Sequence, residues 1–351
     1  MTSPKKILVL HTAFLGDVIL TLPLLQYLHD EFPDATITAV VTPACAPVLA
    51  HHPAVAEVME YDKRGKARGP AGLLKIASDI RGRKFDVAII PHRSLRSALV
   101  CRLANIPMRI GFDRSAARFL LTHIVKYNPA DHEILRNLSL STPLGRSVRH
   151  MILPRLFPST GDRSSVDELL GKSRNFPDMI AVAPGSVWNT KRWPESRYVD
   201  LLRLLAADSL GIVLIGGKED DELCDRIQHA VGSVSVVNTA GKLSPLQSAE
   251  LISRCLVLVS NDTAPMHMGV AMQVPVIAIF GPTVPSFGFA PVGRSDRIVE
   301  TMGLKCRPCG IHGGKSCPVH TFECMLAISV ARVHNEVRAA IHARSAQKVK
   351  R

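Results

Sequence analysis

Short apolar runs alternate with longer segments of helical periodicity along the first third of the chain. Buried strands are predicted where short runs are mainly apolar, at 6–11, 35–42, 55–61, 85–91 and 107–112. Between them, apolar residues recur every three or four positions, which predicts helices over 17–32, 45–53, 69–83 and 94–105. Strands that alternate with helices predict a parallel sheet covered on both faces.

The same alternation begins again after a polar stretch at 159–178. It predicts strands over 179–185, 211–217, 235–241, 256–262 and 274–282, with helices over 194–208, 220–231, 244–255 and 264–273. The last segment, 322–351, has the pattern of an amphipathic helix and ends in a basic tail.

This repeated pattern predicts an α/β protein of two doubly wound, Rossmann-like domains. We expect an N-terminal domain over 1–160, a linker with a helical insert over 161–178, and a second domain over 179–325, followed by the helix and basic tail of 326–351. In such folds ligands bind at the carboxyl ends of the strands, so the domains are expected to face a central cleft.

Composition narrows the class of protein. The 351 residues are 46% hydrophobic and 21% charged, which is typical of a soluble globular protein. No apolar run reaches the roughly 18 residues of a membrane span, and the N-terminus lacks a secretory pattern. A cytoplasmic protein is therefore expected.

The charge is concentrated in the first half. The chain carries a net charge of +13, and residues 1–160 hold 21 Lys and Arg against 12 Asp and Glu. This excess is either a solvated face or a surface for an anionic partner, such as a phosphorylated glycolipid or a membrane. Aromatic residues make up only 5% and no nucleic-acid-binding motif is present, so nucleic acid is not expected as a partner.

Asp17 is the only charged residue between Leu10 and Leu25, in "LHTAFLGDVILTLPLL". It follows a predicted strand and begins a predicted helix. A carboxylate there caps the helix, removes a proton from a substrate, or does both. Apolar neighbours such as Phe14 and Val18 favour the second role, because desolvation raises the pKa of a carboxyl group.

The strongest local motif is "VSNDTAPMHMGVAM", residues 259–272. A strand ends at Asp262, and Pro265 follows in the first turn of a helix whose free amides attract phosphate. Asp262 either caps this helix or accepts a hydrogen bond from a sugar hydroxyl. His267, one turn later, either faces the cleft or is an ordinary core histidine.

Two further loops follow predicted strands of the second domain. In "APGSVWNTKRWPESRY", small Gly185 and Ser186 allow close backbone approach to a ligand, and Lys191 supplies a cation for a leaving diphosphate. The alternative is a solvated basic loop. In "LIGGKEDDEL", Glu219 is placed to accept hydrogen bonds from ribose hydroxyls, or is simply an acid near a helix start.

Several classes of site are excluded or weakly indicated. The chain has no P-loop and no dinucleotide fingerprint, which argues against ATPases and NAD-dependent dehydrogenases. Four cysteines lie close in sequence with spacings of two, seven and six residues: Cys306, Cys309, Cys317 and Cys324. The first pair is typical of a zinc site but the second is not, so a reduced, metal-free loop is favoured.

Taken together, these blocks make the chain resemble glycosyltransferase family 9, the bacterial ADP-heptose:lipopolysaccharide heptosyltransferases. The resemblance runs from about Lys6 to Val333 and is carried by "GDVILTLPLL", "RSLRSALVCRLANIPMRIGF", "PGSVWNTKRWP" and "SNDTAPMHMGVAMQVPVIAIFGPT". It implies a GT-B fold, with the acceptor bound mainly by the first domain and the nucleotide-sugar by the second. The implied reaction transfers heptose from ADP-L-glycero-β-D-manno-heptose with inversion and needs no metal or cofactor.

The resemblance also implies roles for individual residues. Asp17 matches the general base and Lys191 the donor-phosphate lysine. The other donor-binding positions it implies are Ser186, Glu219, Asp262, Thr263, Ala264 and His267. Two positions depart from the family pattern: Val187 replaces a common hydroxyl residue, and Arg96 stands where a lysine is frequent.

The implied acceptor is the lipopolysaccharide core at the inner-membrane surface. Arg93 and Arg96 are acceptor-binding candidates on charge alone. Three alternatives stay open: a family 9 transferase with another donor or acceptor, a sugar-nucleotide epimerase of the same shape, and a non-catalytic metal- or membrane-binding protein built around the cysteine loop.

Overall fold

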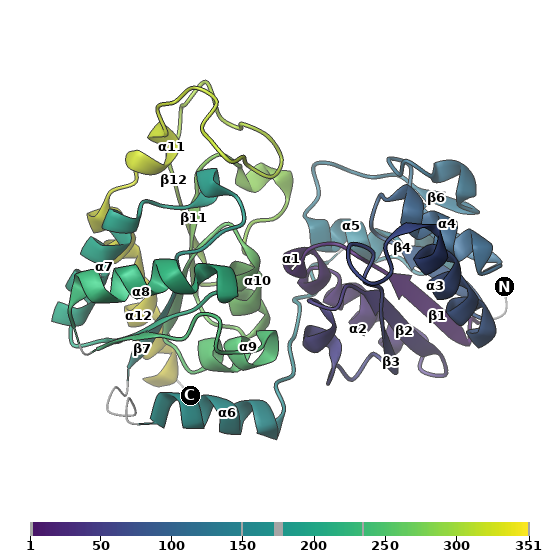
Figure 1. Ribbon diagram of the computed structural model, residues 1–351, viewed down its shortest axis with the longest axis horizontal. Coiled ribbons are helices and arrows are strands. Elements are labelled where there is room, and N and C mark those ends of the chain that lie inside the picture. Colours follow the sequence, from purple (N-terminus) through teal and green to yellow (C-terminus); the bar gives the residue numbers. More distant parts are fainter. Residues whose placement is uncertain (1–2, 149, 172–177, 234, 350–351) are drawn as a thin grey trace. The chain divides into compact units, whose positions relative to one another are not determined.

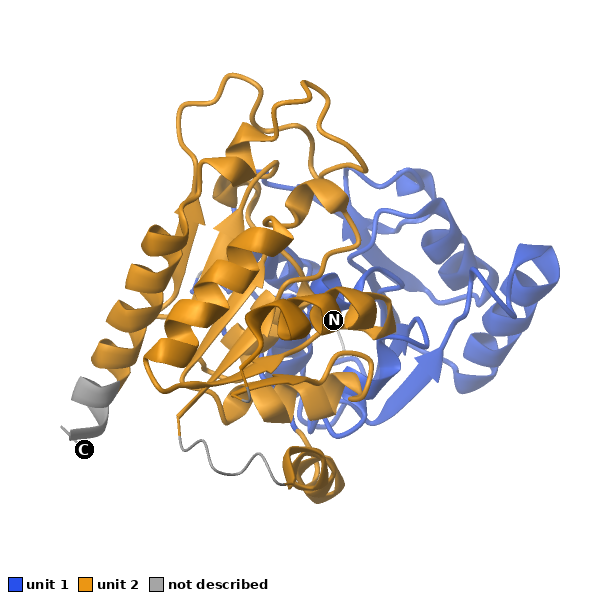
Figure 2. Cartoon of the chain, turned by 60° about the vertical axis from the view of Figure 1, so that its left-hand side comes forward, with its two compact units in different colours: residues 1–157 blue, residues 158–351 orange. Residues whose placement is uncertain are grey.

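The computed structural model describes residues 3–148, 150–171, 178–233 and 235–349. The chain divides into two compact units, 1–157 and 158–351, which Figure 2 colours separately. Part of the predicted linker, 172–177, lies outside the described residues.

The first unit is built around a parallel sheet whose described strands run in the order β3-β2-β1-β4-β5-β6 (Figure 1). The strands are β1 Lys6–Leu10, β2 Thr36–Val41, β3 Glu57–Glu60, β4 Val87–Ile90, β5 Met108–Phe112 and β6 His123–Val125. The helices are α1 Leu15–Ile19, α2 Leu22–Glu31, α3 Gly69–Arg83, α4 Leu95–Leu103 and α5 Glu133–Ser139. Single 3₁₀ turns are η1 Ala46–Leu49, η2 Arg118–Leu120 and η3 Thr142–Leu144.

The predicted continuous helix over 17–32 is wrong, because the chain forms two helices there. α1 ends at Ile19, and α2 begins at Leu22 with Pro23 in its first turn. Proline has no N–H to donate to the carbonyl four residues earlier and its ring clashes with that turn, so a helix cannot continue through it. The break leaves α1 as a short helix that carries Asp17 directly after β1.

The second unit repeats the architecture, with its described strands in the order β12-β11-β10-β7-β8-β9, all parallel. The strands are β7 Met179–Ala183, β8 Gly211–Leu214, β9 Val236–Asn238, β10 Val257–Asn261, β11 Val276–Phe280 and β12 Arg297–Glu300. The helices are α6 Thr160–Leu170, α7 Glu195–Ala207, α8 Asp221–Val231, α9 Pro245–Ser253, α10 Ala264–Ala271, α11 Glu323–Leu326 and α12 Val330–Val349. The 3₁₀ turns are η5 Asn189–Lys191, η6 Lys218–Asp220 and η7 Pro285–Phe287.

The C-terminal segment forms two helices, where the pattern predicted one. The carbonyl of Ile328, between α11 and α12, accepts a hydrogen bond from Trp193 Nε1 at 3.2 Å. Ser329 Oγ then accepts from the Arg332 amide at 3.3 Å and starts α12. α12 buries Val333 and Val337 in the core of the second unit.

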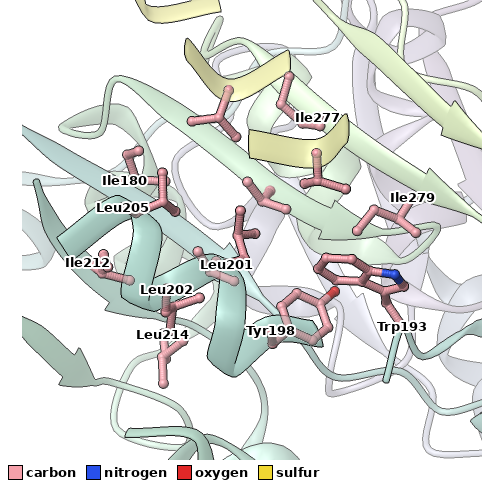
Figure 3. Packing of buried hydrophobic residues seen from close by; sticks show 14 of the residues in the cluster. Ile180, Trp193, Tyr198, Leu201, Leu202, Leu205, Ile212, Leu214, Ile277 and Ile279 are labelled. Atoms are coloured by element: carbon pink, nitrogen blue, oxygen red, sulfur yellow. The ribbon is translucent and has the colours of Figure 1, made fainter. Parts of the chain in front are cut away.

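That core forms where α7 and α12 cover the apolar strands. Trp193 and Tyr198 pack edge to face within it, with ring centroids 5.1 Å apart (Figure 3). The residues around them, including Leu201, Leu202 and Ile279, are almost wholly buried. Each such aliphatic side chain contributes about 1.5–3 kcal/mol relative to exposure, so packing of these helices fixes the strand ends that carry the loops.

Both sheets reverse their strand order beside their first strand. The reversal falls between β1 and β4 in the first unit and between β7 and β10 in the second. At such a point the loops leave in opposite directions and open a crevice at the carboxyl ends of the strands. Asp17 follows β1, Lys191 follows β7, and Asp262 follows β10, so each lies in a segment that leaves a switch point.

Candidate functional site

A buried ion pair joins two loops at the switch point of the second unit. Lys191 Nζ lies 2.6 Å from Asp262 Oδ2 and 3.2 Å from the Asp262 carbonyl oxygen. Thr283 donates its hydroxyl to the same carboxylate oxygen at 2.7 Å. The side chains of Lys191 and Asp262 are only 12% and 8% exposed. An ammonium has three N–H donors, and Asp262 takes two, which holds Lys191 in one place.

Asp262 does not cap the helix that follows it. Thr263 is the N-cap of α10, and its side chain makes no capping hydrogen bond to the first turn. Ala264 opens the helix and Pro265 follows it, so small or donor-free residues line this helix start. His267 is buried, with 6% of its surface exposed. The Asp262 carboxylate is turned to Lys191 because a buried cation needs a partner of opposite charge.

Asn261 links three parts of this site by hydrogen bonds, and the sequence did not single it out. It is fully buried, and its Oδ1 accepts from the Trp193 amide at 3.1 Å and the Tyr198 hydroxyl at 3.0 Å. Its Nδ2 donates to the carbonyl of Pro184 at 2.9 Å. These bonds tie the end of β10 to the loop after β7 and to the start of α7. The only sequence signal was its place beside Asp262 in the "SNDTAP" block.

Ser186 shapes the loop that leads to Lys191. Its hydroxyl accepts from the Trp188 amide at 3.1 Å, and its carbonyl accepts from Arg192 Nε at 2.8 Å. Ser186 is buried, whereas the neighbouring Val187 is 74% exposed. Ser186 therefore fixes the turn that leads to η5 through its own hydroxyl and carbonyl.

Asp220, which the sequence suggested only as a first-turn acid, fills the space above Gly185. A Cβ on Gly185 would lie 2.1 Å from Asp220 Oδ1, so the approach requires glycine. Asp220 Oδ2 also accepts from the Gly217 amide at 3.1 Å, and burial raises the pKa of the Asp220 carboxyl. Glu219, on the same turn η6, is exposed.

In the first unit, Asp17 caps α1 from within its first turn. Its Oδ2 accepts from the Phe14 amide at 3.3 Å, and the side chain is half-buried at position three of the helix. The expectation that Asp17 begins the helix is therefore off by two residues, because α1 begins at Leu15. The helix dipole favours a carboxylate in the first turn. The capping role of Asp17 therefore does not exclude a catalytic role.

A buried hydrogen-bond chain holds the break that follows Asp17. The Thr21 hydroxyl donates to the Asp17 carbonyl at 2.9 Å and pairs with His11 Nδ1 at 2.6 Å. Because Thr21 gives its proton to Asp17, His11 must carry its own proton on Nδ1. Asn137 Nδ2 donates to the Leu20 carbonyl at 3.2 Å. The helix that carries Asp17 is thus fixed from β1 and from α5.

Two histidines lie directly after or near the ends of the neighbouring strands β1 and β4. The rings of His11 and His92 lie 6.0 Å apart. Burial, the neighbouring His92 and the cation of Lys63 lower the pKa of His11 to about 3. Burial and Lys63 lower the pKa of His92 to about 4. Lys63 donates to the Thr12 carbonyl at 2.6 Å, and its held ammonium favours the neutral form of both imidazoles.

An arginine-rich group in the first unit is centred on Tyr127. The guanidinium groups of Arg93 and Arg114 lie 5.3 and 5.2 Å from the centroid of its ring. Buried Arg136 donates to the Tyr127 hydroxyl and to Glu133 Oε2, each at 2.8 Å. Burial raises the pKa of Glu133; Arg136 opposes the rise and the Asp17 charge adds to it.

Arg96 is placed differently from Arg93. Its Nε donates to the Tyr61 hydroxyl at 2.5 Å, and Nη2 donates to the carbonyls of Ala67 and Gly69 at 2.8 and 3.0 Å. Arg96 therefore anchors the loop before α3. Arg93 is exposed, and its guanidinium group lies over the Tyr127 ring instead. The structure thus separates two arginines that charge alone had grouped.

The four clustered cysteines are free thiols. Within the described residues, no group of three or more His, Cys, Asp or Glu side chains is arranged to hold a metal ion. Likewise, none of the helices in that part of the chain combines the length and apolarity needed to cross a bilayer.

Two doubly wound units, with a cation held at the switch point of the second, define a glycosyltransferase of the GT-B class. The family model of glycosyltransferase family 9 (heptosyltransferase) matches residues 73–316, more than half of the chain. The chain belongs to glycosyltransferase family 9.

Similar proteins support the same class. The chain is 29% identical over 310 residues to lipopolysaccharide heptosyltransferase 2 of Escherichia coli, covering 84% of this chain and 88% of that protein. The structure of E. coli ADP-heptose lps heptosyltransferase II superposes with a TM-score of 0.81, at 26% identity over 97% of this chain and 99% of that one. A family 9 glycosyltransferase from Veillonella parvula shares the fold, with a TM-score of 0.88 at 23% identity over 97% and 98% of the two chains.

Proposed function

We propose that this chain is an inverting heptosyltransferase of the heptosyltransferase II type. It moves heptose from ADP-L-glycero-β-D-manno-heptose to the inner core of lipopolysaccharide. The observation that carries the proposal is the buried Lys191–Asp262 pair at the switch point of the second unit, in a chain of family 9. A held cation at that position suits a substrate whose leaving group is a diphosphate.

The donor is held by the loops after β7, β8 and β10. Lys191 uses its remaining N–H donor to bind the diphosphate and to stabilise the charge that grows as ADP leaves. The amides at the start of α10, from Thr263 and Ala264, face the same charge. Asp262 orients Lys191, Ser186 shapes the phosphate loop, Glu219 accepts from the ribose hydroxyls, and His267 supports the helix start.

Asp17 is the proposed general base. Inversion proceeds through one in-line displacement, in which the acceptor hydroxyl loses its proton as its bond to the anomeric carbon forms. The carboxylate takes that proton and ADP leaves from the opposite face. The buried chain through Thr21, His11 and Asn137 fixes the backbone of Asp17, which keeps the base oriented at small entropic cost.

The acceptor side of the proposal rests on exposed guanidinium groups. Arg93 and Arg114 lie over the Tyr127 ring, and the charges of Arg93 and Asp17 both act on Glu133 in the same unit. Such groups bind the carboxylates and phosphates of an anionic core oligosaccharide. With a net charge of +13, the chain also suits an acceptor embedded in an anionic surface, the cytoplasmic face of the inner membrane.

An acceptor series tests the proposal. Purified protein is given ADP-heptose and defined core oligosaccharides that carry no heptose, one heptose or two. We expect transfer to the one-heptose acceptor alone, read by mass spectrometry. Transfer to the acceptor without heptose would contradict the assignment to the heptosyltransferase II type, and release of ADP without any glycosylated product would contradict the transfer itself.

A further inference from the structure

The segment 306–314, which carries Cys306 and Cys309, is hydrogen-bonded to the loop that carries Lys191. Thr190, next to Lys191, donates its amide and its hydroxyl to the Gly314 carbonyl, both at 3.1 Å. The Gly314 amide in turn donates to Thr190 Oγ1 at 2.8 Å. Thr190 is 5% exposed and Gly314 is half-buried, so this three-bond clasp is partly shielded from water and joins positions 124 residues apart.

The same segment touches the Lys191 side chain itself. Gly313 has a φ of +82°, and a Cβ placed on it would lie 3.2 Å from Lys191 Cγ and 3.1 Å from Thr190 Oγ1. The bare backbone of Gly313 therefore lies against the stem of the lysine. Any larger residue there would both strain the backbone and press on Lys191.

The other end of the segment is anchored to the opposite side of the ion pair. The Cys309 amide donates to the Pro282 carbonyl at 2.9 Å, and Arg307 donates to the Thr283 carbonyl at 2.7 Å. Thr283 is the residue whose hydroxyl holds Asp262. One segment thus contacts the neighbours of both members of the Lys191–Asp262 pair.

We propose that the segment 306–314 is a positioning element of the donor site, and that Thr190 is a positioning residue that acts through Lys191. The ligand of this donor site is a nucleoside diphosphate. The 3₁₀ turn η5, which carries Lys191, is only three residues long, and such turns have poor hydrogen-bond geometry of their own. The clasp supplies the missing constraint, and a cation held in place stabilises a diphosphate better than one that must first be ordered.

The inference rests on the proposed role of Lys191 and is tested by ADP binding, measured by calorimetry. Thr190→Val keeps the shape of the side chain and removes the clasp hydroxyl, whereas Thr190→Ser keeps the hydroxyl. Loss of the clasp bonds is expected to weaken ADP binding about five- to tenfold in the valine variant, and by less than about twofold in the serine variant.

A double-mutant cycle separates positioning from general loss of structure. In a Lys191→Ala background, Thr190→Val is expected to change ADP affinity by less than about twofold, because the residue it positions is absent. An equal loss in both backgrounds would overturn the proposal. So would unchanged ADP affinity in Thr190→Val, or a serine variant as weak as the valine variant.

A glycine pair gives a second test if Thr190→Val does not fold. Gly313→Ala and Gly303→Ala place a Cβ at nearly the same positive φ, +82° and +78°, but Gly303 has nothing within 4 Å. Only Gly313→Ala is expected to weaken ADP binding, and equal affinities would overturn the inference. Wild-type protein that binds ADP but transfers no heptose would contradict the proposed function alone, whereas wild-type protein that binds no ADP would overturn both.

Discussion

Lys191 and Asp262 form an ion pair of 2.6 Å between the loop after β7 and the end of β10. The pair is almost buried, and Thr283 and the Asp262 carbonyl add one hydrogen bond to each of its members. A buried charge with its partner removed is costly, so each residue holds the other in place. The cation of the proposed donor site is therefore held in place by the protein itself.

The first prediction concerns the cation. Lys191→Ala removes one charge-assisted hydrogen bond to the diphosphate and is expected to weaken ADP binding about ten- to a hundredfold. Lys242→Ala, which removes an exposed lysine of the same unit, serves as the control and is expected to bind ADP normally. Calorimetry measures both. Unchanged affinity in Lys191→Ala would remove this residue from the donor site.

A second prediction concerns the base. Asp17→Asn keeps an oxygen to accept from the Phe14 amide, so the fold is expected to persist. Turnover is expected to fall about 10²- to 10⁴-fold, because an amide cannot take the acceptor proton. ADP affinity should stay unchanged. Asp30→Asn, on the exposed face of α2, is the matched control, and wild-type turnover in Asp17→Asn would exclude Asp17 as the base.

The close approach of Gly185 and Asp220 leads to a third prediction. Gly185→Ala places a methyl group 2.1 Å from Asp220 Oδ1, so one of the two loops must move. We expect weaker ADP binding and a lower melting temperature. Gly82→Ala, whose added Cβ meets nothing within 4 Å, is expected to leave both unchanged. Equal behaviour of the two variants would show that the close contact has no consequence.

The arginines around Tyr127 give a fourth prediction, which separates binding from structure. Arg93→Ala and Arg114→Ala are expected to raise the KM for the acceptor about tenfold or more each, with the donor KM unchanged. Arg96→Ala is expected to lower the melting temperature instead, because Arg96 holds Tyr61 and the loop at Ala67. A rise in the donor KM for Arg93→Ala would contradict its acceptor role.

The buried histidines of the first unit predict a dependence of stability on pH. Burial lowers the pKa of His52 to about 4, against about 6.5 in the unfolded chain. Between these values the unfolded state binds the extra proton, so stability rises with pH there. The stabilising contribution is complete above pH 6.5 and is lost as pH falls toward 4.

His52→Asn tests this dependence, because its side-chain oxygen can still accept the Ala54 amide, which bonds His52 Nδ1 at 3.2 Å. The free energy of unfolding of the wild type is expected to fall on acidification by up to about 1.4 kcal/mol per pH unit more than that of the variant. Chemical denaturation at pH 7.5 and pH 5 measures the difference. Parallel pH curves would contradict the assignment.

Much of the fold could be predicted from the sequence because the central parallel strands are mainly apolar. The strand from Lys6 and the helix over 69–83 lie where the pattern placed them. Two strands were missed, β6 and β12, since each is an edge strand of three or four residues with only two adjacent apolar positions. The break before α2 was missed because the apolar spacing over 17–32 predicted one helix although Pro23 interrupts it.

The candidate site was predictable as a set of residues but not as a set of contacts. Lys191 and Asp262 were each singled out from local motifs, yet their pairing spans 71 residues and depends on the order of β7 and β10. Glu133 had no motif at all, and only the packing of α5 brings it near Asp17. The hydrogen bonds that Arg96 donates to Tyr61, Ala67 and Gly69 likewise follow from the geometry of the loop and not from the charge of Arg96.

The measurement that tests the central claim most directly is transfer from a panel of nucleotide-sugars to a one-heptose core acceptor. ADP-heptose, UDP-glucose and GDP-mannose are each supplied with the wild-type protein, and the products are read by mass spectrometry. The account predicts that the acceptor gains one heptosyl residue, from ADP-heptose alone. Transfer from another donor, or no transfer from ADP-heptose, would contradict it.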